Sequence, residues 1–236
     1  MSSEVCRVSG KVDAVRIPKQ IYFAHRVVGA TKPDIHIIGH WTYPKDTTKT
    51  MYLIANTPSV ELFINDKSVG KSSKPADTYV FSFPNVAWAA GSIKAVGYDA
   101  SGAPACQHEL KTAGAPAAIK LTPTVGPRGF LADGADVAMF DVEVVDADGQ
   151  RCPTDEARID FEMTGPGIWR GGYNTAVLNS TNNKYLLTEA GINRVFVRST
   201  LTPGTITVTA TRSGLTSATA SVTSKAITVT GGVAYL

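Results

Sequence analysis

The sequence lacks the features that identify several large classes of protein. Cysteine is scarce, because only Cys6, Cys106 and Cys152 occur, far apart and without a C-x-x-C spacing. An odd number of widely spaced cysteines argues against both a disulfide framework and a zinc site. We therefore expect buried free thiols, with a single disulfide as the alternative.

Excess charge and long apolar runs are also missing. The net charge is +3 and the basic residues are scattered, which excludes a nucleic-acid partner. No apolar run reaches the length of a membrane-spanning helix, so we expect no membrane partner. Residues 1–6 (MSSEVC) lack the layout of a signal peptide, which leaves the compartment unmarked, as in a fragment of a larger protein.

Motifs for cofactors, metals and nucleophilic catalysis are not found either. The sequence contains no P-loop, no G-x-G-x-x-G and no Ser-His-Asp order of a hydrolase triad. His36 and His40 are four residues apart, and on a strand they would lie about 13 Å from each other. That separation is too large for one metal ion, so we expect neither a metal nor a cofactor.

Residues 1–31 differ in pattern from the rest of the chain. Pro18 suits the first turn of a helix, and Gly29 supplies a stop. Between them, residues recur at helical spacing at Ile21, Tyr22, His25 and Val28. One short amphipathic helix is predicted, with no evident surface in the next domain to receive it, as in the tail of a preceding domain.

From Asp34 the apolar period changes to two, which is typical of strands. Seven short strands are predicted, at 34–41, 51–56, 60–65, 67–71, 79–83, 92–99 and 105–111. Because turn residues and no helical pattern separate them, we expect an immunoglobulin-like β-sandwich over residues 32–113. The small residues 112–116 (TAGAP) form the predicted domain boundary.

The strand pattern restarts beyond that boundary. Phe140, Val142 and Val144 alternate with acidic residues, and Ile159 and Phe161 repeat the pattern. Further strands are predicted at 118–122, 192–199, 205–212, 218–222 and 226–230. We expect residues 115–236 to form a second immunoglobulin-like sandwich, so that the fold class is all-β with two tandem sandwiches.

Residues 165–174 (GPGIWRGGYN) interrupt this rhythm and are followed by an amide-rich stretch, 179–183 (NSTNN). Aromatic rings stack on the C–H faces of sugars, while amides and guanidinium groups pair with hydroxyls. The predicted carbohydrate-binding residues are Trp169, Arg170, Tyr173, Asn174, Asn182 and Asn183. The alternative is that Trp169 is a buried core residue and the glycines serve tight packing.

The chain resembles a known family in several ordered segments. Residues 12–22 (VDAVRIPKQIY) are similar to the last barrel-helix region of glycoside hydrolase family 2, which includes β-galactosidases and β-glucuronidases. Residues 38–43, 60–71 and 94–99 resemble the sandwich that follows the barrel in many of these enzymes. Residues 132–136, 144–149 and 165–174 resemble their further C-terminal immunoglobulin-like domain.

The resemblance implies a bacterial, β-galactosidase-like enzyme of polysaccharide degradation, from which residues 1–31 are a remnant of the catalytic barrel. The family's two catalytic glutamates lie upstream of these segments, so we expect no enzymatic activity from the chain itself. Hydrolysis with retention needs two carboxylates about 5 Å apart. The acidic residues Asp141, Glu143, Asp160 and Glu162 fit the solvated side of a sheet better.

Two functions remain open. The first is a carbohydrate-binding accessory region that holds an oligo- or polysaccharide through Trp169 and its polar neighbours. The alternative is a structural spacer or oligomerisation region that packs on the catalytic barrel of the parent hydrolase, without a glycan site. A periplasmic or extracellular location is expected for the larger enzyme.

Overall fold

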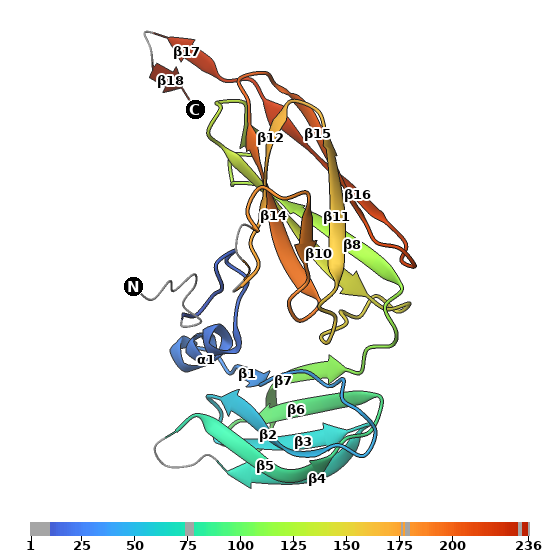
Figure 1. Ribbon diagram of the computed structural model, residues 1–236. Helices are drawn as coiled ribbons and strands as arrows, with labels where there is room; N and C mark the ends of the chain where they lie inside the picture. The colour runs from blue at the N-terminus through green and yellow to red at the C-terminus, as the bar shows by residue number, and fades with distance from the viewer. Residues whose placement is uncertain (1–9, 74–77, 176, 178–179, 231–232, 236) are drawn as a thin grey trace, which may run out of the picture. The chain divides into compact units, whose positions relative to one another are not determined.

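The computed structural model describes residues 10–73, 78–175, 177, 180–230 and 233–235. Within these residues the chain forms one α-helix and otherwise β-strands, β1 to β18, most of them in antiparallel sheets (Figure 1). The prediction of a mostly β chain with one short helix is confirmed. In the part of the chain that is described, no helix is long and apolar enough to cross a membrane.

The chain divides into two compact units between Ala113 and Gly114. Each of the two residues is anchored through its main-chain N–H within its own unit. The N–H of Ala113 donates to Thr42 Oγ1 at 2.9 Å, and that of Gly114 donates to Asp146 Oδ2 at 2.7 Å. The change of unit therefore occurs within a single peptide bond.

The first unit contains two sheets that share one hydrophobic core. The first sheet has the strand order β1 (Ile35–Ile37), β2 (Thr48–Ala55), β5 (Val80–Ala87). The second has the order β4 (Lys67–Ser73), β3 (Ser59–Ile64), β6 (Ser92–Tyr98), β7 (Pro104–Lys111). Buried side chains of both sheets form one cluster, which includes Leu53, Leu62 and Trp41. All seven strands predicted from the alternation in this region are present.

Trp41 belongs to that core and not to a binding surface. It is 1% exposed, and its indole N–H donates to the main-chain oxygen of Ala89 at 3.0 Å. Trp88 donates in turn to the main-chain oxygen of Trp41 at 3.1 Å. Both residues therefore pack within the core of their own unit.

The helix α1 (Gln20–Gly29) forms as predicted, but it has two apolar faces. Phe23 and Val27 face the first unit, where the Phe23 ring stacks on His36 of β1 and Val27 is fully buried. The expectation that the following strands cannot receive this helix is therefore wrong. Residues of the predicted apolar face, Ile21, Tyr22 and Val28, remain 40–49% exposed on the other side.

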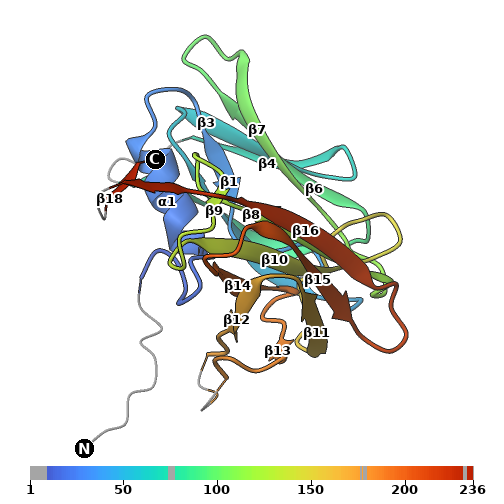
Figure 2. The same cartoon turned by 90° about the horizontal axis from the view of Figure 1, so that it is seen from above.

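The second unit contains three sheets (Figure 2). One has the order β12 (Gly167–Gly172), β14 (Ile192–Ser199), β10 (Val137–Val145), β8 (Ala118–Thr124). Another has the order β13 (Tyr185–Leu187), β11 (Arg158–Thr164), β15 (Gly204–Thr211), β16 (Ala218–Lys225), β9 (Phe130–Leu131). The third pairs β17 (Thr228–Thr230) with β18 (Val233–Tyr235).

Alternation along the strands separates core from surface. In β10, Phe140, Val142 and Val144 are buried, as their spacing predicts. In β15, Ile206 and Val208 point inward. On the exposed face of β15 and β16, three hydroxyl pairs cross between the strands at 2.8–3.1 Å, namely Thr205–Thr223, Thr207–Ser221 and Thr209–Thr219.

Residues 165–174 interrupt the strand pattern in the sequence, but in the structure they are mainly a strand. Most of them form β12, an edge strand that pairs antiparallel with β14. Its register shifts between Trp169 and Gly171, which leaves Arg170 as the extra residue of a β-bulge. Strands β9, β13 and β18 were not predicted either, and each has only two or three residues.

Candidate functional site

The two stretches predicted to act together, 165–174 and 179–183, do lie side by side where the structure describes them. Gly171 of β12 forms an isolated antiparallel bridge with Thr181. The N–H of Asn182 donates to the main-chain oxygen of Arg170 at 3.1 Å. The indole N–H of Trp169 donates to the main-chain oxygen of Asn183 at 2.9 Å. The amide-rich segment therefore lines the outer edge of β12.

A glycine makes this close approach possible. Gly171 has a φ of +64°, a conformation that residues with a side chain adopt only at a cost. A Cβ atom at Gly171 would lie 2.9 Å from the main-chain nitrogen of Asn182 and 3.0 Å from the oxygen of Asn183. The bulge and the glycine together let the second backbone pack directly against the strand.

Trp169 is half-buried. Its ring lies 5.6 Å from that of Phe161, centre to centre, and tilted by 38° to it. Phe161 is a core residue of β11, in the other large sheet of the unit. Trp169 therefore packs partly on the core, and its N–H is already hydrogen-bonded. It is neither the fully buried core residue nor the fully exposed stacking residue that the sequence left as alternatives.

Asn174 serves the structure of the loop. It is 4% exposed, and its Nδ2 donates to the oxygen of Leu187 at 2.9 Å. Its Oδ1 accepts from the N–H of Leu187, also at 2.9 Å. A further bond joins its Nδ2 to Glu189 Oε1 at 3.2 Å. With both ends of the amide engaged, Asn174 does not offer the open hydrogen-bonding group expected of it.

The other predicted residues divide by exposure. Arg170 and Asn182 are exposed and adjacent, whereas Tyr173 and Asn183 are half-buried. Asn182 has a φ of +63°, a conformation that asparagine tolerates better than most residues. Of the six predicted residues, only Arg170 and Asn182 are exposed.

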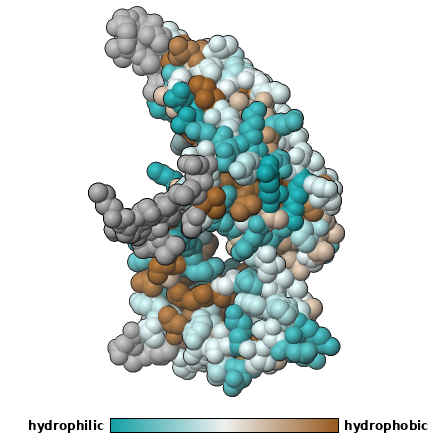
Figure 3. All heavy atoms as spheres, in the orientation of Figure 1, coloured by the Kyte–Doolittle hydropathy of each residue, from teal (hydrophilic) through white to brown (hydrophobic). Residues whose placement is uncertain are grey.

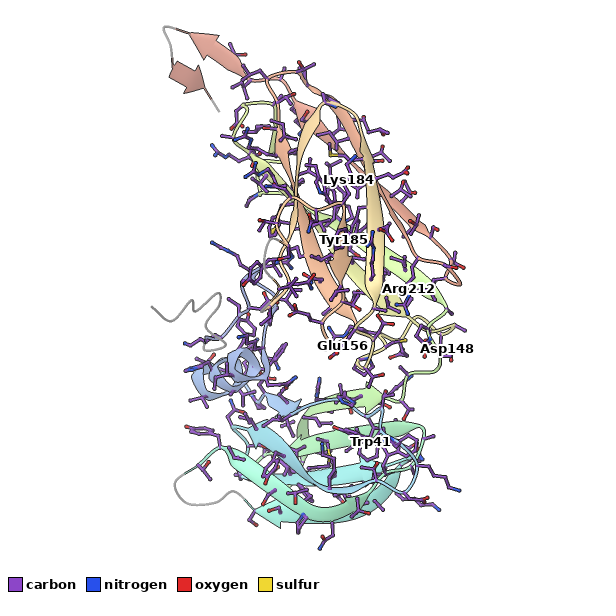
Figure 4. The ribbon with its side chains drawn as sticks, viewed as in Figure 1. Trp41, Asp148, Glu156, Lys184, Tyr185 and Arg212 are labelled. Carbon is purple, nitrogen blue, oxygen red and sulfur yellow. The ribbon has the colours of Figure 1, made fainter. Side chains whose placement is uncertain are left out.

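An exposed aromatic residue two positions after Asn183 was missed in the sequence. Tyr185 of β13 is 41% exposed, and the guanidinium carbon of Arg158 lies 4.0 Å from its ring centre. Arg158 is also paired with Asp160 on the same strand. Figure 4 labels Tyr185 together with the neighbouring Lys184. The available signal was the alternation of exposed Tyr185 and Leu187 around buried Leu186.

A shallow hollow of about 360 Å³ lies next to Asn174. Glu156, Thr188 and Glu189 contribute its polar lining. Glu189 is engaged, since its Oε1 accepts from the N–H of Thr175 at 2.7 Å and its Oε2 from the Thr175 hydroxyl at 2.9 Å. Of the two carboxylates that line the hollow, Glu189 therefore holds a loop in place.

Asp155 lies buried close to this hollow, 8% exposed. Burial raises the pKa of its carboxyl, but the hydroxyl of Thr188 and the guanidinium of Arg212 outweigh that effect and lower the pKa. The Arg212 Nη1 lies 2.7 Å from Asp155 Oδ2 (Figure 4 labels Arg212). Asp155 is thus held ionised within the unit.

Acidic residues of the exposed strand faces are also paired. Asp141 accepts from Arg194, Glu143 from Lys120, and Asp160 from Arg158. His40 lies beyond the end of β1 and stacks on Tyr43. No group of three or more metal-binding side chains is found among the described residues.

Known protein families match both units. Residues 121–221 match the family described as glycoside hydrolase family 2 C-terminal domain 5. Residues 46–106 match a domain of unknown function, DUF4982. A β-glucuronidase from Formosa agariphila is 54% identical over 208 residues, covering 88% of this chain and 21% of that protein.

The chain consists of C-terminal, non-catalytic domains of glycoside hydrolase family 2. A β-galactosidase of the same family from Bacteroides ovatus is 33% identical over 168 residues, covering 69% of this chain and 19% of the relative. The chain therefore spans about a fifth of the length of these relatives. The family resemblance inferred from the sequence is confirmed.

Solved structures of family 2 enzymes contain the same arrangement of elements. A family 2 β-glucuronidase structure matches with a TM-score of 0.93 and 51% identity, covering 97% of this chain and 24% of that one. A family 2 member from Bacteroides cellulosilyticus matches with a TM-score of 0.82 and 26% identity, covering 92% and 31% respectively.

Proposed function

We propose that these domains act as a packing region of a longer family 2 enzyme, with the outward face of α1 as the contact to the rest of that enzyme. The observation that carries this proposal is the second apolar face of the helix. Ile21, Tyr22 and Val28 are 49%, 40% and 48% exposed, although the opposite face already packs on the first unit.

Single exposed apolar residues are common on proteins, but several on one helix face are more informative. In Figure 3, brown, hydrophobic atoms lie in the region of α1 among paler and teal ones. A helix that only covered its own unit would carry mainly polar residues on its outer side, whereas here exposed His25 is accompanied by Ile21, Tyr22 and Val28. Since the matched relatives are about four times as long as this chain, their remaining parts are natural candidates to cover this face.

The proposal is tested with the double variant Ile21→Lys and Val28→Lys, made in this chain and in the longer enzyme. We expect the thermal stability of the isolated chain to stay nearly constant, because both side chains are exposed in it. The melting temperature of the longer enzyme should fall, because two charges would be buried without partners.

The matched control is the double variant Val69→Lys and Val80→Lys. These residues are 45% and 39% exposed, but they lie on β4 and β5 and not on the helix. The control should leave both proteins unchanged. If the helix variant leaves the longer enzyme as stable as the wild type, the proposed contact does not exist.

We propose glycan binding at the edge of β12 as a second function, within an immunoglobulin-like sandwich. The observation that favours it is the grouping of exposed Arg170 and Asn182 next to half-buried Trp169, with exposed Tyr185 following in the same segment. Tyr173 and Asn183 would line this surface, and Asn174 would hold its loop in place. The names of the relatives suggest β-glucuronides or β-galactosides as the sugar class.

Affinity electrophoresis of this chain in gels that contain different polysaccharides tests the second function. A double variant Arg170→Ala and Asn182→Gly should lose the retardation that the wild type shows. Its control is Lys67→Ala and Lys71→Ala in β4 of the other unit, which should be retarded as the wild type is. An unretarded wild type on every polysaccharide would leave only the packing function.

A further inference from the structure

Two histidines lie at the contact between α1 and the first unit. His36, in the centre of β1, is 6% exposed. One face of its ring stacks on Phe23 of α1, with centres 4.3 Å apart and an interplanar angle of 11°. Its other neighbour is His108 of β7, whose ring centre lies 4.7 Å away. The imidazole of His36 is therefore enclosed between a helix and a strand.

The hydrogen bonds favour the neutral form of both rings. His108 Nδ1 accepts from the main-chain N–H of Ile37 at 3.1 Å, so a proton cannot occupy that nitrogen without breaking the bond. His36 Nε2 lies 2.8 Å from the side-chain oxygen of Gln20, which can only accept, so Nε2 carries the proton. His36 Nδ1 is buried and has no hydrogen-bond partner among the described residues. A second proton there would be a buried donor without an acceptor.

The charges around the pair do not compensate for such a proton. Arg26 of α1 lies close by and is paired with Asp34, the residue before β1, at 2.8 Å. Burial, then His108 and Arg26, lower the pKa of His36 to about 4, against the opposing effect of Asp34. Burial and then Arg26 also lower the pKa of His108, again opposed by Asp34. From β2, the residue opposite His36 is the apolar Ile54.

We propose that the pair His36 and His108 makes the attachment of α1 to the first unit acid-sensitive. At neutral pH both rings are uncharged and Phe23 stacks on His36. Once α1 has detached, His36 has lost both Phe23 and Gln20, and its ring takes up a proton at the ordinary histidine pKa near 6.5. The detached state therefore gains stability as the pH falls below about 6.5, and the attached state loses it progressively down to the folded pKa of His36, about 4.

The size of the effect follows from linkage. With a pKa of about 4 when attached and about 6.5 when detached, His36 alone raises the population of the detached state roughly 20-fold between pH 7 and pH 5. His108 acts in the same direction. This range lies above the ordinary pKa values of exposed carboxyl groups, so their titration does not account for it. Release of α1 would expose Phe23 and the fully buried Val27.

This inference does not depend on what covers the outer face of α1, so it is tested on the 236-residue chain alone. The measurement is amide hydrogen exchange in residues 20–29, converted to protection factors at pH 7.0 and pH 5.0 to remove the intrinsic effect of pH. We expect protection in α1 to fall by at least tenfold at pH 5.0. Protection in the central strands β3 and β6 should stay constant.

The variant that removes the effect is His36→Gln with His108→Asn. Glutamine retains a donor for the oxygen of Gln20, and asparagine retains an acceptor for the N–H of Ile37, but neither can be protonated. Its α1 protection should be the same at both pH values. The control, His25→Gln with His40→Gln, replaces the other two histidines of the chain and should retain the wild-type response.

Direct titration of the four imidazoles by NMR provides a second readout that does not need a folded variant. We expect the rings of His36 and His108 to titrate below the ordinary histidine pKa near 6.5. The inference is overturned if both rings titrate near 6.5, or if α1 protection in the wild type is independent of pH between 7.0 and 5.0.

Discussion

The indole N–H of Trp169 donates to the main-chain oxygen of Asn183, 2.9 Å away, and this bond joins β12 to the amide-rich segment that follows it. The same ring packs on Phe161 of the opposite sheet. Trp169 therefore connects three segments of the second unit, namely β12, β11 and the amide-rich segment.

We expect Trp169→Ala to lower the free energy of unfolding of the second unit by about 2 kcal/mol. This lies between a surface change, below about 0.5 kcal/mol, and a fully buried aromatic residue, about 3–5 kcal/mol. Trp169→Phe should retain the ring packing and lose about 1 kcal/mol for the hydrogen bond. Urea unfolding followed by circular dichroism measures both, with Arg170→Ala as the exposed control. A loss below 0.5 kcal/mol for Trp169→Ala would show that the ring contributes no packing.

Asn174→Ala should be more damaging than its loop position suggests. The substitution leaves the N–H of Leu187 without its partner, for a cost of about 1–3 kcal/mol, while the oxygen of Leu187 still accepts from Asn193 Nδ2 at 2.8 Å. The control Asn182→Gly should be neutral, because glycine adopts the φ of +63° at that position without strain. Thermal melts of the two variants give the comparison. Equal melting temperatures would contradict the structural role of Asn174 in this loop.

Two arginine–aspartate pairs in the second unit should contribute differently to the free energy of unfolding. Arg212→Met would leave buried Asp155 without its ionic partner, at a cost of about 3 kcal/mol. Arg158→Met removes a pair whose two side chains are about half exposed, and should change the stability little. Chemical denaturation at pH 7 ranks the two. The assignment of Asp155 as a buried, ionised group fails if the order is reversed.

Separate fragments test the boundary between Ala113 and Gly114. We expect residues 8–113 and 114–236 each to give a cooperative melt. Residues 32–113 should be less stable than residues 8–113, because they lack Val27, which is fully buried, and Phe23, which stacks on His36. A second fragment that melts only in the presence of the first would mean that the two units form one cooperative structure.

The chain should have no glycosidase activity of its own. It matches non-catalytic domains, and the strand-face carboxylates Asp141, Glu143 and Asp160 are each paired with a basic side chain. Assays with nitrophenyl β-glucuronide and β-galactoside at high protein concentration measure this. Turnover that co-purifies with the chain and is absent from a mock preparation would refute the expectation.

The sequence was sufficient to predict most strands, because alternation reports burial directly. In β10 and β15, every second residue is apolar and the structure buries these residues. The strand β12 was not predicted because its glycines have no side chain to show the alternation. The segments 165–174 and 179–183 were nevertheless placed together correctly where they are described, since they are near in sequence.

Contacts between distant segments were not accessible from the sequence. The outward orientation of Ile21 and Val28 follows from Phe23 and Val27 packing on β1, and both faces of the helix are apolar. The burial of Asn174 depends on its pairing with Leu187, thirteen residues further along the chain. Neither residue type nor spacing indicates which of several amides will be enclosed in this way.

The hydroxyl pairs between β15 and β16 have a consequence for the conditions that this surface tolerates. Threonine and serine hydroxyls do not ionise in the physiological range, and salt screens charges without weakening bonds between neutral groups. The hydrogen bonds of Thr205–Thr223, Thr207–Ser221 and Thr209–Thr219 should therefore remain formed at high salt concentration and at mildly acidic pH. The side-chain contacts between β15 and β16 on this exposed face are therefore made by hydroxyl groups that are insensitive to salt and to pH.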